Sequence, residues 1–136
     1  MASGNHALHP LTMVCIADDG AVRKIVAATR EFGAGLPDEV AARLAIIAEE
    51  LVSNLIDHAA LPAGAAIEFG LALAGGRVWL TLSDTAAAFD PRVVTDAAIP
   101  VRGGSAGLTL VRAWAEIASY DRVRDRNVLK LSLPAG

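Results

Sequence analysis

The chain has few of the residues on which several common classes of protein depend. It carries one cysteine, Cys15, in 136 residues, so it cannot form an internal disulfide, and this favours a reducing, cytoplasmic compartment. Aromatic residues make up only 4% of the chain, and 12 Lys+Arg stand against 15 Asp+Glu. With a net charge of -3 and few rings on which bases could stack, the composition argues against direct binding to nucleic acid.

Long hydrophobic runs are also missing. Hydrophobic residues make up 54% of the chain, but alanine raises that figure and charged residues interrupt every run, so no membrane span is expected. The first apolar run, 11–17, has no Lys or Arg before it and no cleavage-like site after it, which argues against a signal peptide. The length predicts a single domain over 11–136 that follows a loose leader over 1–10.

Periodicity and capping residues predict the element order β-α-α-β-β-loop-α-β-β, in which Asp18 and Asp19 can cap the first helix. Strands are expected at 11–17, 66–73, 77–83, 118–123 and 128–133, and helices at 20–32, 37–59 and 106–119. A further short helical piece is expected near 93–97. Because neighbouring strands come as hairpins, with Gly75-Gly76 as one turn signal, we expect a mixed, mostly antiparallel sheet. With three helices on one face, the fold class is a two-layer α/β sandwich.

Three segments contain residue types that suit a ligand site, and the first is helical. In 49–59 (EELVSNLIDHA), Glu50 and Asn54 are four residues apart and therefore lie on one helix face, with Asp57 near them. This polar strip borders an apolar stripe, so we expect it at the rim of the core. There a carboxylate and an amide could position a proton and a metal-bound water. The alternative interpretation is a solvated helix face.

The second and third segments are a strand end and a glycine-rich helix start. In 84–91 (DTAAAFDP), Asp84 could accept a hydrogen bond from a ligand's amino group, and the alternative is an ordinary turn. In 102–114 (RGGSAGLTLVRAW), small residues precede a helix whose N–H groups and dipole favour an anion, and the alternative is a loop entering a helix. His58 has no histidine or cysteine partner at metal spacing, so a zinc site is not expected.

In this order and spacing, the three segments resemble the N, G1 and G2 boxes of the GHKL (histidine kinase-like) ATPase superfamily. The small size and the tail NVLKLSL resemble its anti-sigma factor and serine-protein kinase branch. The resemblance implies a Bergerat-type fold with an ATP site between the helices and the sheet. It implies that Glu50 is the general base, that Asn54 is the ligand of Mg and that Asp84 receives the adenine amino group. The remaining contacts to ATP would fall at Ala86, Ala88, Gly103, Gly104, Gly107 and Leu108.

The same resemblance implies an ATP-dependent protein serine/threonine kinase that regulates transcription. Such a protein binds a sigma factor and phosphorylates a small anti-sigma antagonist protein. A homodimer is compatible with the resemblance, and the residues themselves leave the oligomeric state open. The main alternative is a catalytically degenerate GHKL-fold binding module that sequesters a partner without kinase activity. The catalytic piece of a sensor histidine kinase is a third hypothesis, disfavoured because no phosphoacceptor helix pair precedes the domain.

Several positions depart from the superfamily's pattern. Ala86 and Ala88 stand where the G1 box usually has glycine, and alanine costs about 1 kcal/mol at any position that needs a positive φ. Ser105 replaces a frequent glycine of the G2 box. Asp57 stands where relatives often carry Lys or Arg, and a carboxylate about 6 Å from a phosphate would repel it by roughly 3 kcal/mol. Ala86, Ala88 and Asp57 motivate the binding module as the alternative, while the joint presence of Glu50, Asn54 and Asp84 keeps the kinase as the first hypothesis.

Overall fold

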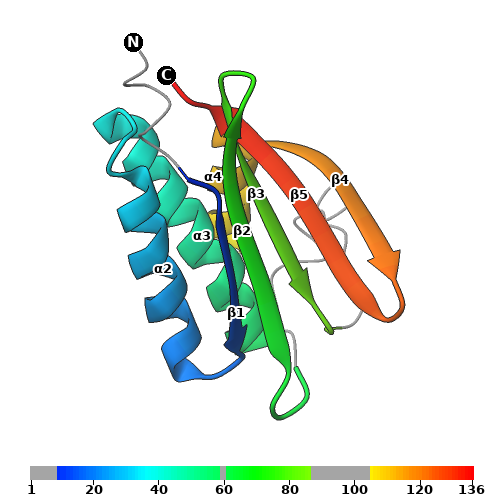
Figure 1. The fold of residues 1–136 in the computed structure, drawn as a ribbon. Helices are drawn as coiled ribbons and strands as arrows, with labels where there is room; N and C mark the ends of the chain where they lie inside the picture. The colour runs from blue at the N-terminus through cyan, green and yellow to red at the C-terminus, as the bar shows by residue number, and fades with distance from the viewer. Residues whose placement is uncertain (1–8, 59–60, 87–104) are drawn as a thin grey trace.

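The computed structural model describes residues 9–58, 61–86 and 105–136 (Figure 1). Its elements follow the predicted order β-α-α-β-β-α-β-β. They are β1 (Leu11–Ile16), α2 (Asp19–Gly33), α3 (Asp38–His58), β2 (Ala66–Ala74), β3 (Arg77–Asp84), α4 (Ser105–Trp114), β4 (Glu116–Val123) and β5 (Arg126–Pro134). The short helical piece predicted near 93–97 lies outside the described residues, as does most of the predicted leader.

The five strands form one sheet in the order β1-β2-β3-β5-β4, and every pairing between neighbours is antiparallel. The helices α2, α3 and α4 lie together on one side of this sheet (Figure 1). The two-layer α/β sandwich predicted from the sequence is therefore confirmed. Since β3 and β5 are antiparallel neighbours, the end of β3 lies next to the start of β5. These two strand ends form one end of the candidate site.

Local sequence signals explain most of the element boundaries. The side chain of Asp18 caps α2 by accepting a hydrogen bond from the backbone N–H of Gly20 at 2.9 Å, and α2 ends at Gly33. The turn between β2 and β3 places Gly75 at φ 60° and Gly76 at φ 75°, the left-handed conformation that glycine adopts without strain. Both signals were read correctly from the sequence.

Most boundaries differ from their predictions by one or two residues, and the largest difference is at the end of the last helix. The last helix was expected to continue to residue 119, but α4 ends at Trp114 and β4 begins at Glu116. The segment pairs with β5 from Glu116 onward, with a register shift between Ile117 and Ser119. Pairing with β5 from Arg126 to Ser132 satisfies more backbone groups than another helical turn would, so tertiary pairing overrides the local helical pattern.

The core lies between the helices and one face of the sheet. On α3 the predicted apolar stripe is largely buried, with Leu44 and Ile47 fully buried and Leu51 6% exposed. On the sheet, alternate residues point toward the helices and include Phe69, Leu71, Leu80, Leu82, Leu129 and Leu131, all of which are buried. Cys15 is a free, buried thiol in this same core. None of the helices in the described ranges combines the length and apolar character needed to cross a bilayer.

Candidate functional site

Asp84 is a buried carboxylate at the end of β3. It is two residues beyond Leu82, so its side chain points to the same face of the sheet, the one that the helices cover. Its side chain is only 4% exposed. One oxygen, Oδ1, accepts hydrogen bonds from the backbone N–H of Ala86 and from Nδ2 of Asn127, both at 2.9 Å. No group in the described residues donates to the other oxygen, Oδ2, which is therefore available to a ligand.

Asn127 was not singled out in the sequence, where it lies next to the predicted turn before the last strand. The structure places it directly opposite Asp84 in the ladder between β3 and β5, and it is 5% exposed. Its Nδ2 also donates to the carbonyl oxygen of Ala86 at 3.1 Å, and Arg122 donates to that same oxygen at 2.6 Å. The only local signal was a polar residue beginning an alternating strand, and Asp84 and Ala86, the acceptors of its Nδ2, lie about forty residues away in the chain.

Ala86 follows Asp84 and has a buried methyl group, 5% exposed. Arg124 and Asp125 are the non-glycine residues with a positive φ in the part of the chain that the structure describes, so Ala86 is not in the left-handed region. Alanine is unfavourable only where the backbone needs a positive φ, so Ala86 causes no backbone strain here. Ala88 lies outside the described residues, and its conformation stays untested.

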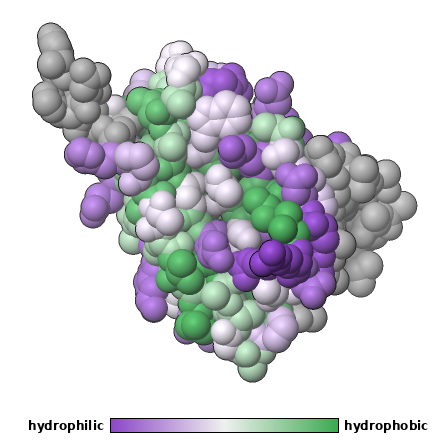
Figure 2. Space-filling view, turned by 45° about the vertical axis from the view of Figure 1, so that its right-hand side comes forward, coloured by the Kyte–Doolittle hydropathy of each residue, from purple (hydrophilic) through white to green (hydrophobic). Residues whose placement is uncertain are grey.

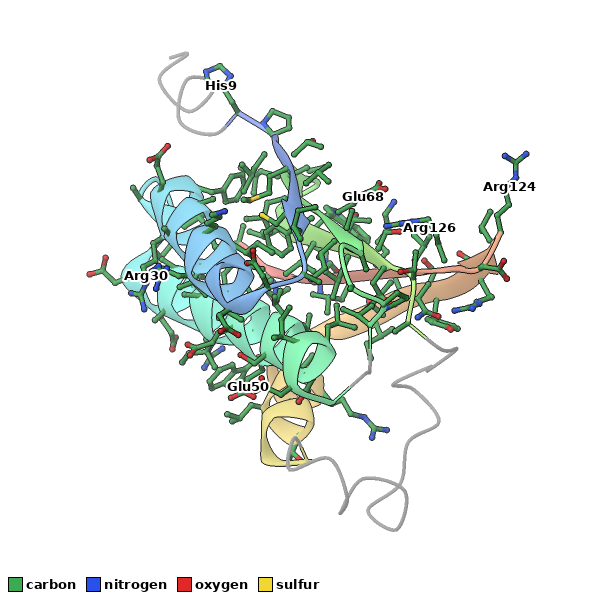
Figure 3. All side chains as sticks on the ribbon, turned by 90° about the horizontal axis from the view of Figure 1, so that it is seen from below. His9, Arg30, Glu50, Glu68, Arg124 and Arg126 are labelled. Carbon is green, nitrogen blue, oxygen red and sulfur yellow. The ribbon has the colours of Figure 1, made fainter. Side chains whose placement is uncertain are left out.

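Glu50 and Asn54 lie on one face of α3, both half-buried beside the apolar stripe. Glu50 is two helical turns after Arg43, whose guanidinium stacks over the ring of Trp114 in α4 at 5.4 Å from the centroid. Glu50 therefore lies on the side of α3 that faces α4, as Figure 3 also shows. No described group forms a hydrogen bond or ion pair with either side chain. The predicted position at the rim of the core is confirmed.

The remaining predicted contacts are placed only in part. Gly107 and Leu108 lie in the first turn of α4, and that turn carries no acidic residue that would oppose an anion at the positive end of the helix dipole. Gly103 and Gly104 lie outside the described residues, and the side chain of His58 is not described. Asp57 is exposed in the last turn of α3, one turn after Asn54.

The donor set fits a magnesium ion that is held mainly by a nucleotide. No group of three or more His, Cys, Asp or Glu that could hold a metal occurs among the described residues. Mg²⁺ commonly takes one or two protein oxygens and fills its other positions with phosphate oxygens and waters. The half-buried oxygen of Asn54, which has no partner in the ranges that the structure describes, meets that requirement together with the carboxylate of Glu50 four residues before it.

A separate hollow of about 760 Å³ lies over the other face of the sheet. Its lining includes Gly70, Ala72, Trp79 and Lys130, and the ammonium group of Lys130 lies 5.8 Å from the centroid of the Trp79 ring. These residues alternate with the core residues of their strands, so they point away from the helices. Neither Asp84 nor the polar pair of α3 lines this hollow, which is therefore distinct from the candidate site.

Comparisons with solved structures agree with the fold. The structure of the blue-light activated histidine kinase of Erythrobacter litoralis EL346 superposes with a TM-score of 0.59 and 18% sequence identity. The match covers 85% of this chain and 41% of the kinase chain. The histidine kinase domain of that protein matches 85% of this chain and 60% of its own, with 19% identity and a TM-score of 0.56. This chain thus corresponds to only part of each solved chain, and similarity at such identity concerns the fold alone.

Sequence comparisons supply the family. A search of curated proteins finds no match. The family model of the histidine kinase-like ATPase domain matches residues 15–133, which include Glu50, Asn54, Asp84 and Asn127. Since the match extends over most of the chain, this protein belongs to the histidine kinase-like ATPase domain family.

Proposed function

We propose that this chain binds Mg-ATP between its helices and the end of β3 and transfers the γ-phosphoryl group to a serine or threonine of a small antagonist protein. In this proposal it also binds a sigma factor, so that phosphorylation of the antagonist controls which partner is held. The observation that carries the proposal is the buried Asp84, whose Oδ1 is held by two donors while Oδ2 has none among the described residues.

The chemistry of Asp84 supports recognition of an adenine base. A carboxylate oxygen is an acceptor only, so Oδ2 pairs with an N–H donor such as the exocyclic amino group of adenine. Burial of the carboxylate keeps water from competing for that hydrogen bond, which increases its contribution to affinity. The face of the sheet that holds Asp84 is also the face against which the helices pack, so Asp84 and the polar rim of α3 lie on the same side of the sheet.

Glu50 is suited to act as a general base. Its carboxylate is half-buried and has no described partner, so it is available to accept the proton of a substrate hydroxyl. As that proton moves to Glu50, the hydroxyl oxygen forms a bond to the γ-phosphorus and the bond to the bridging oxygen of ADP breaks. Asn54 would hold Mg²⁺, which when bound supplies positive charge that offsets the negative charge of the phosphates.

The first test is calorimetric titration of the full chain with Mg-ATP. We expect a dissociation constant between micromolar and sub-millimolar values, weakened about tenfold in Asn54→Ala. Ser53→Ala, at the preceding residue of the same helix, is the matched control and should bind like the wild type. Absence of binding by a folded wild-type protein would overturn the nucleotide site and, with it, the kinase.

The second test follows the phosphoryl group. The protein is incubated with Mg-ATP labelled at the γ-phosphate and with a small antagonist-type protein from the same organism, and phosphoserine and phosphothreonine are measured. Transfer that disappears in Glu50→Gln supports the kinase. Stable binding of the antagonist and of ATP without any transfer would instead support the catalytically degenerate binding module.

The binding module is the second candidate, and Asp57 favours it. This exposed carboxylate lies one turn after Asn54, where a negative charge opposes the approach of phosphates. Replacing it in Asp57→Asn should strengthen binding of Mg-ATP several-fold if the phosphates lie near this end of α3. Unchanged affinity would show that Asp57 gives the binding module no support.

A further inference from the structure

Asn127 occupies the centre of a polar cluster that joins three strands. In the sheet it is paired with Asp84 of β3 on one side and with Arg122 of β4 on the other. Tyr120 lies two residues before Arg122, on the same face of β4. The cluster therefore connects the β4–β5 hairpin to the carboxylate at the end of β3. Figure 2 shows hydrophilic residues gathered on the side of the molecule that carries this hairpin, whose exposed residues include Arg122, Arg124 and Asp125.

The amide of Asn127 has its hydrogen-bonding capacity filled within the protein. Its Nδ2 donates to Oδ1 of Asp84 at 2.9 Å and to the carbonyl oxygen of Ala86 at 3.1 Å. Its Oδ1 accepts from the hydroxyl of Tyr120 and from Nη1 of Arg122, the latter at 3.1 Å. A side-chain amide has two donor hydrogens and two acceptor lone pairs, so these four bonds use all of them.

The same four bonds fix the orientation of the amide. A flipped amide would point its oxygen at the carboxylate of Asp84 and at the carbonyl of Ala86, two acceptors that cannot donate in return. Tyr120 and Arg122, which donate to the amide oxygen, therefore determine which way Nδ2 points. Arg122 also donates to the carbonyl of Ala86 at 2.6 Å, which anchors the segment that follows Asp84.

We propose that Tyr120, Arg122 and Asn127 are positioning residues that set how strongly the site selects a purine with an amino group at its 6-position. This inference rests on the proposed nucleotide site. Asn127 has no hydrogen-bonding group left for a ligand, so its effect is transmitted through Asp84. With Oδ1 held by Asn127 and the Ala86 N–H, the carboxylate plane is fixed and Oδ2 is directed at a ligand donor. Loosening that plane weakens the bond to the 6-amino group and leaves the contacts to the phosphates unchanged.

The test compares ATP with purine riboside 5′-triphosphate, which lacks the 6-amino group and keeps the ribose and the phosphates. Dissociation constants for both, with Mg²⁺, are measured by calorimetry on the full chain as wild type, Asn127→Ala and Tyr120→Phe. Asp121→Asn is the matched control, since Asp121 is exposed between two cluster residues on β4 and points to the other face of the sheet. Thermal unfolding of each variant reports whether it is folded.

We expect the wild type to prefer ATP by about tenfold, the effect of one net hydrogen bond. That ratio should fall to about twofold or less in Asn127→Ala and partway in Tyr120→Phe, while Asp121→Asn keeps it. If Asn127→Ala does not fold, Tyr120→Phe, which removes one hydroxyl from an otherwise identical ring, decides the question.

The outcomes separate this inference from the proposed function. If Asn127→Ala and Tyr120→Phe weaken both nucleotides by the same factor and keep the wild-type ratio, the cluster is purely structural and the inference is wrong although the nucleotide site stands. If the wild type binds ATP without preferring it, Asp84 does not receive the amino group and the inference is likewise wrong. If the wild type binds neither nucleotide, the proposed nucleotide site itself is wrong.

Discussion

The two ends of the candidate site treat their polar groups in opposite ways. At the end of β3, Asp84 and Asn127 are almost fully buried, and their side chains bond to protein groups on two neighbouring strands. On α3, Glu50 and Asn54 are half-buried and have no hydrogen-bond or ion-pair partner among the described residues. At the strand end, internal hydrogen bonds hold the polar groups and leave Oδ2 of Asp84 for a ligand, whereas on α3 neither polar side chain is held by a described partner.

This difference indicates that the strand end contributes mainly to selective binding and that α3 contributes mainly to chemistry. Groups that are prearranged by internal hydrogen bonds do not have to be ordered when a ligand arrives, so they contribute to selective binding. Groups without internal partners can change proton or metal occupancy without disturbing the fold. Substitutions at the strand end should therefore change stability and nucleotide affinity together. Substitutions on α3 should change catalysis or metal-dependent binding and leave stability alone.

The largest expected effect tests the open end. Glu50→Gln should lower phosphoryl transfer to the antagonist about 1,000-fold, since glutamine cannot accept the substrate proton. ATP affinity should change less than about threefold, because the side chain keeps its size and breaks no described contact. Single-turnover transfer and calorimetry measure the two quantities. Glu49→Gln, an exposed neighbour on the same helix, is the control, and transfer that survives in Glu50→Gln would rule out the general base.

The next effect compares the two ends in one measurement. Asn127→Ala should lower the free energy of unfolding by about 2–3 kcal/mol, because it leaves Asp84 and the donors on β4 without their shared partner. Asn54→Ala should lower it by less than about 0.5 kcal/mol, since no described group loses a bond. Urea denaturation of both variants gives the values. Equal losses would show that the two ends do not differ as described.

A third substitution sharpens the role of the buried carboxylate. In Asp84→Asn, an amide oxygen can still accept from Ala86 and Asn127, so the fold should be kept. The NH₂ group would then stand in place of Oδ2 and face a ligand donor with another donor. ATP affinity should fall by about 10- to 30-fold, measured by calorimetry. Affinity like that of the wild type would mean that the base does not contact this carboxylate.

The smallest expected effect concerns Ala86, two residues after that carboxylate. Ala86→Gly should not tighten ATP binding, because Ala86 does not have a positive φ from which glycine could relieve strain. It should instead lower the free energy of unfolding by about 0.5–1 kcal/mol through the added freedom of the unfolded chain and the lost buried methyl group. Thermal unfolding and calorimetry measure both. Tighter ATP binding in this variant would show that alanine hinders the ligand here.

Most of the fold could be predicted because its signals are local. The cap at Asp18 and the turn at Gly75-Gly76 depend on two to four neighbouring residues, and the structure confirms both. The end of α4 could not be predicted in the same way. There the segment from Glu116 satisfies its backbone by pairing with β5, which a helical period in the sequence does not report.

In the candidate site, too, residues with local sequence signals were predicted and a residue that depends on a distant partner was not. Glu50, Asn54 and Asp84 were proposed because each belongs to a short motif with a familiar spacing. Asn127 was missed because its role depends on a hydrogen bond to Asp84, which is 43 residues away in the chain and directly opposite in the sheet. Ala88, Gly103 and Gly104 stay predictions, since they lie outside the described residues.

The separation of Asp84 from Asn127 also has a consequence for the order of folding. The β2–β3 and β4–β5 hairpins can each close over a short turn, while β3 and β5 meet only after a much longer loop has closed. The base end of the site is therefore assembled late, after both hairpins exist. A nucleotide that binds there recognises the finished protein and not the transition state of folding. We expect bound ATP to slow unfolding while leaving the rate of folding almost unchanged.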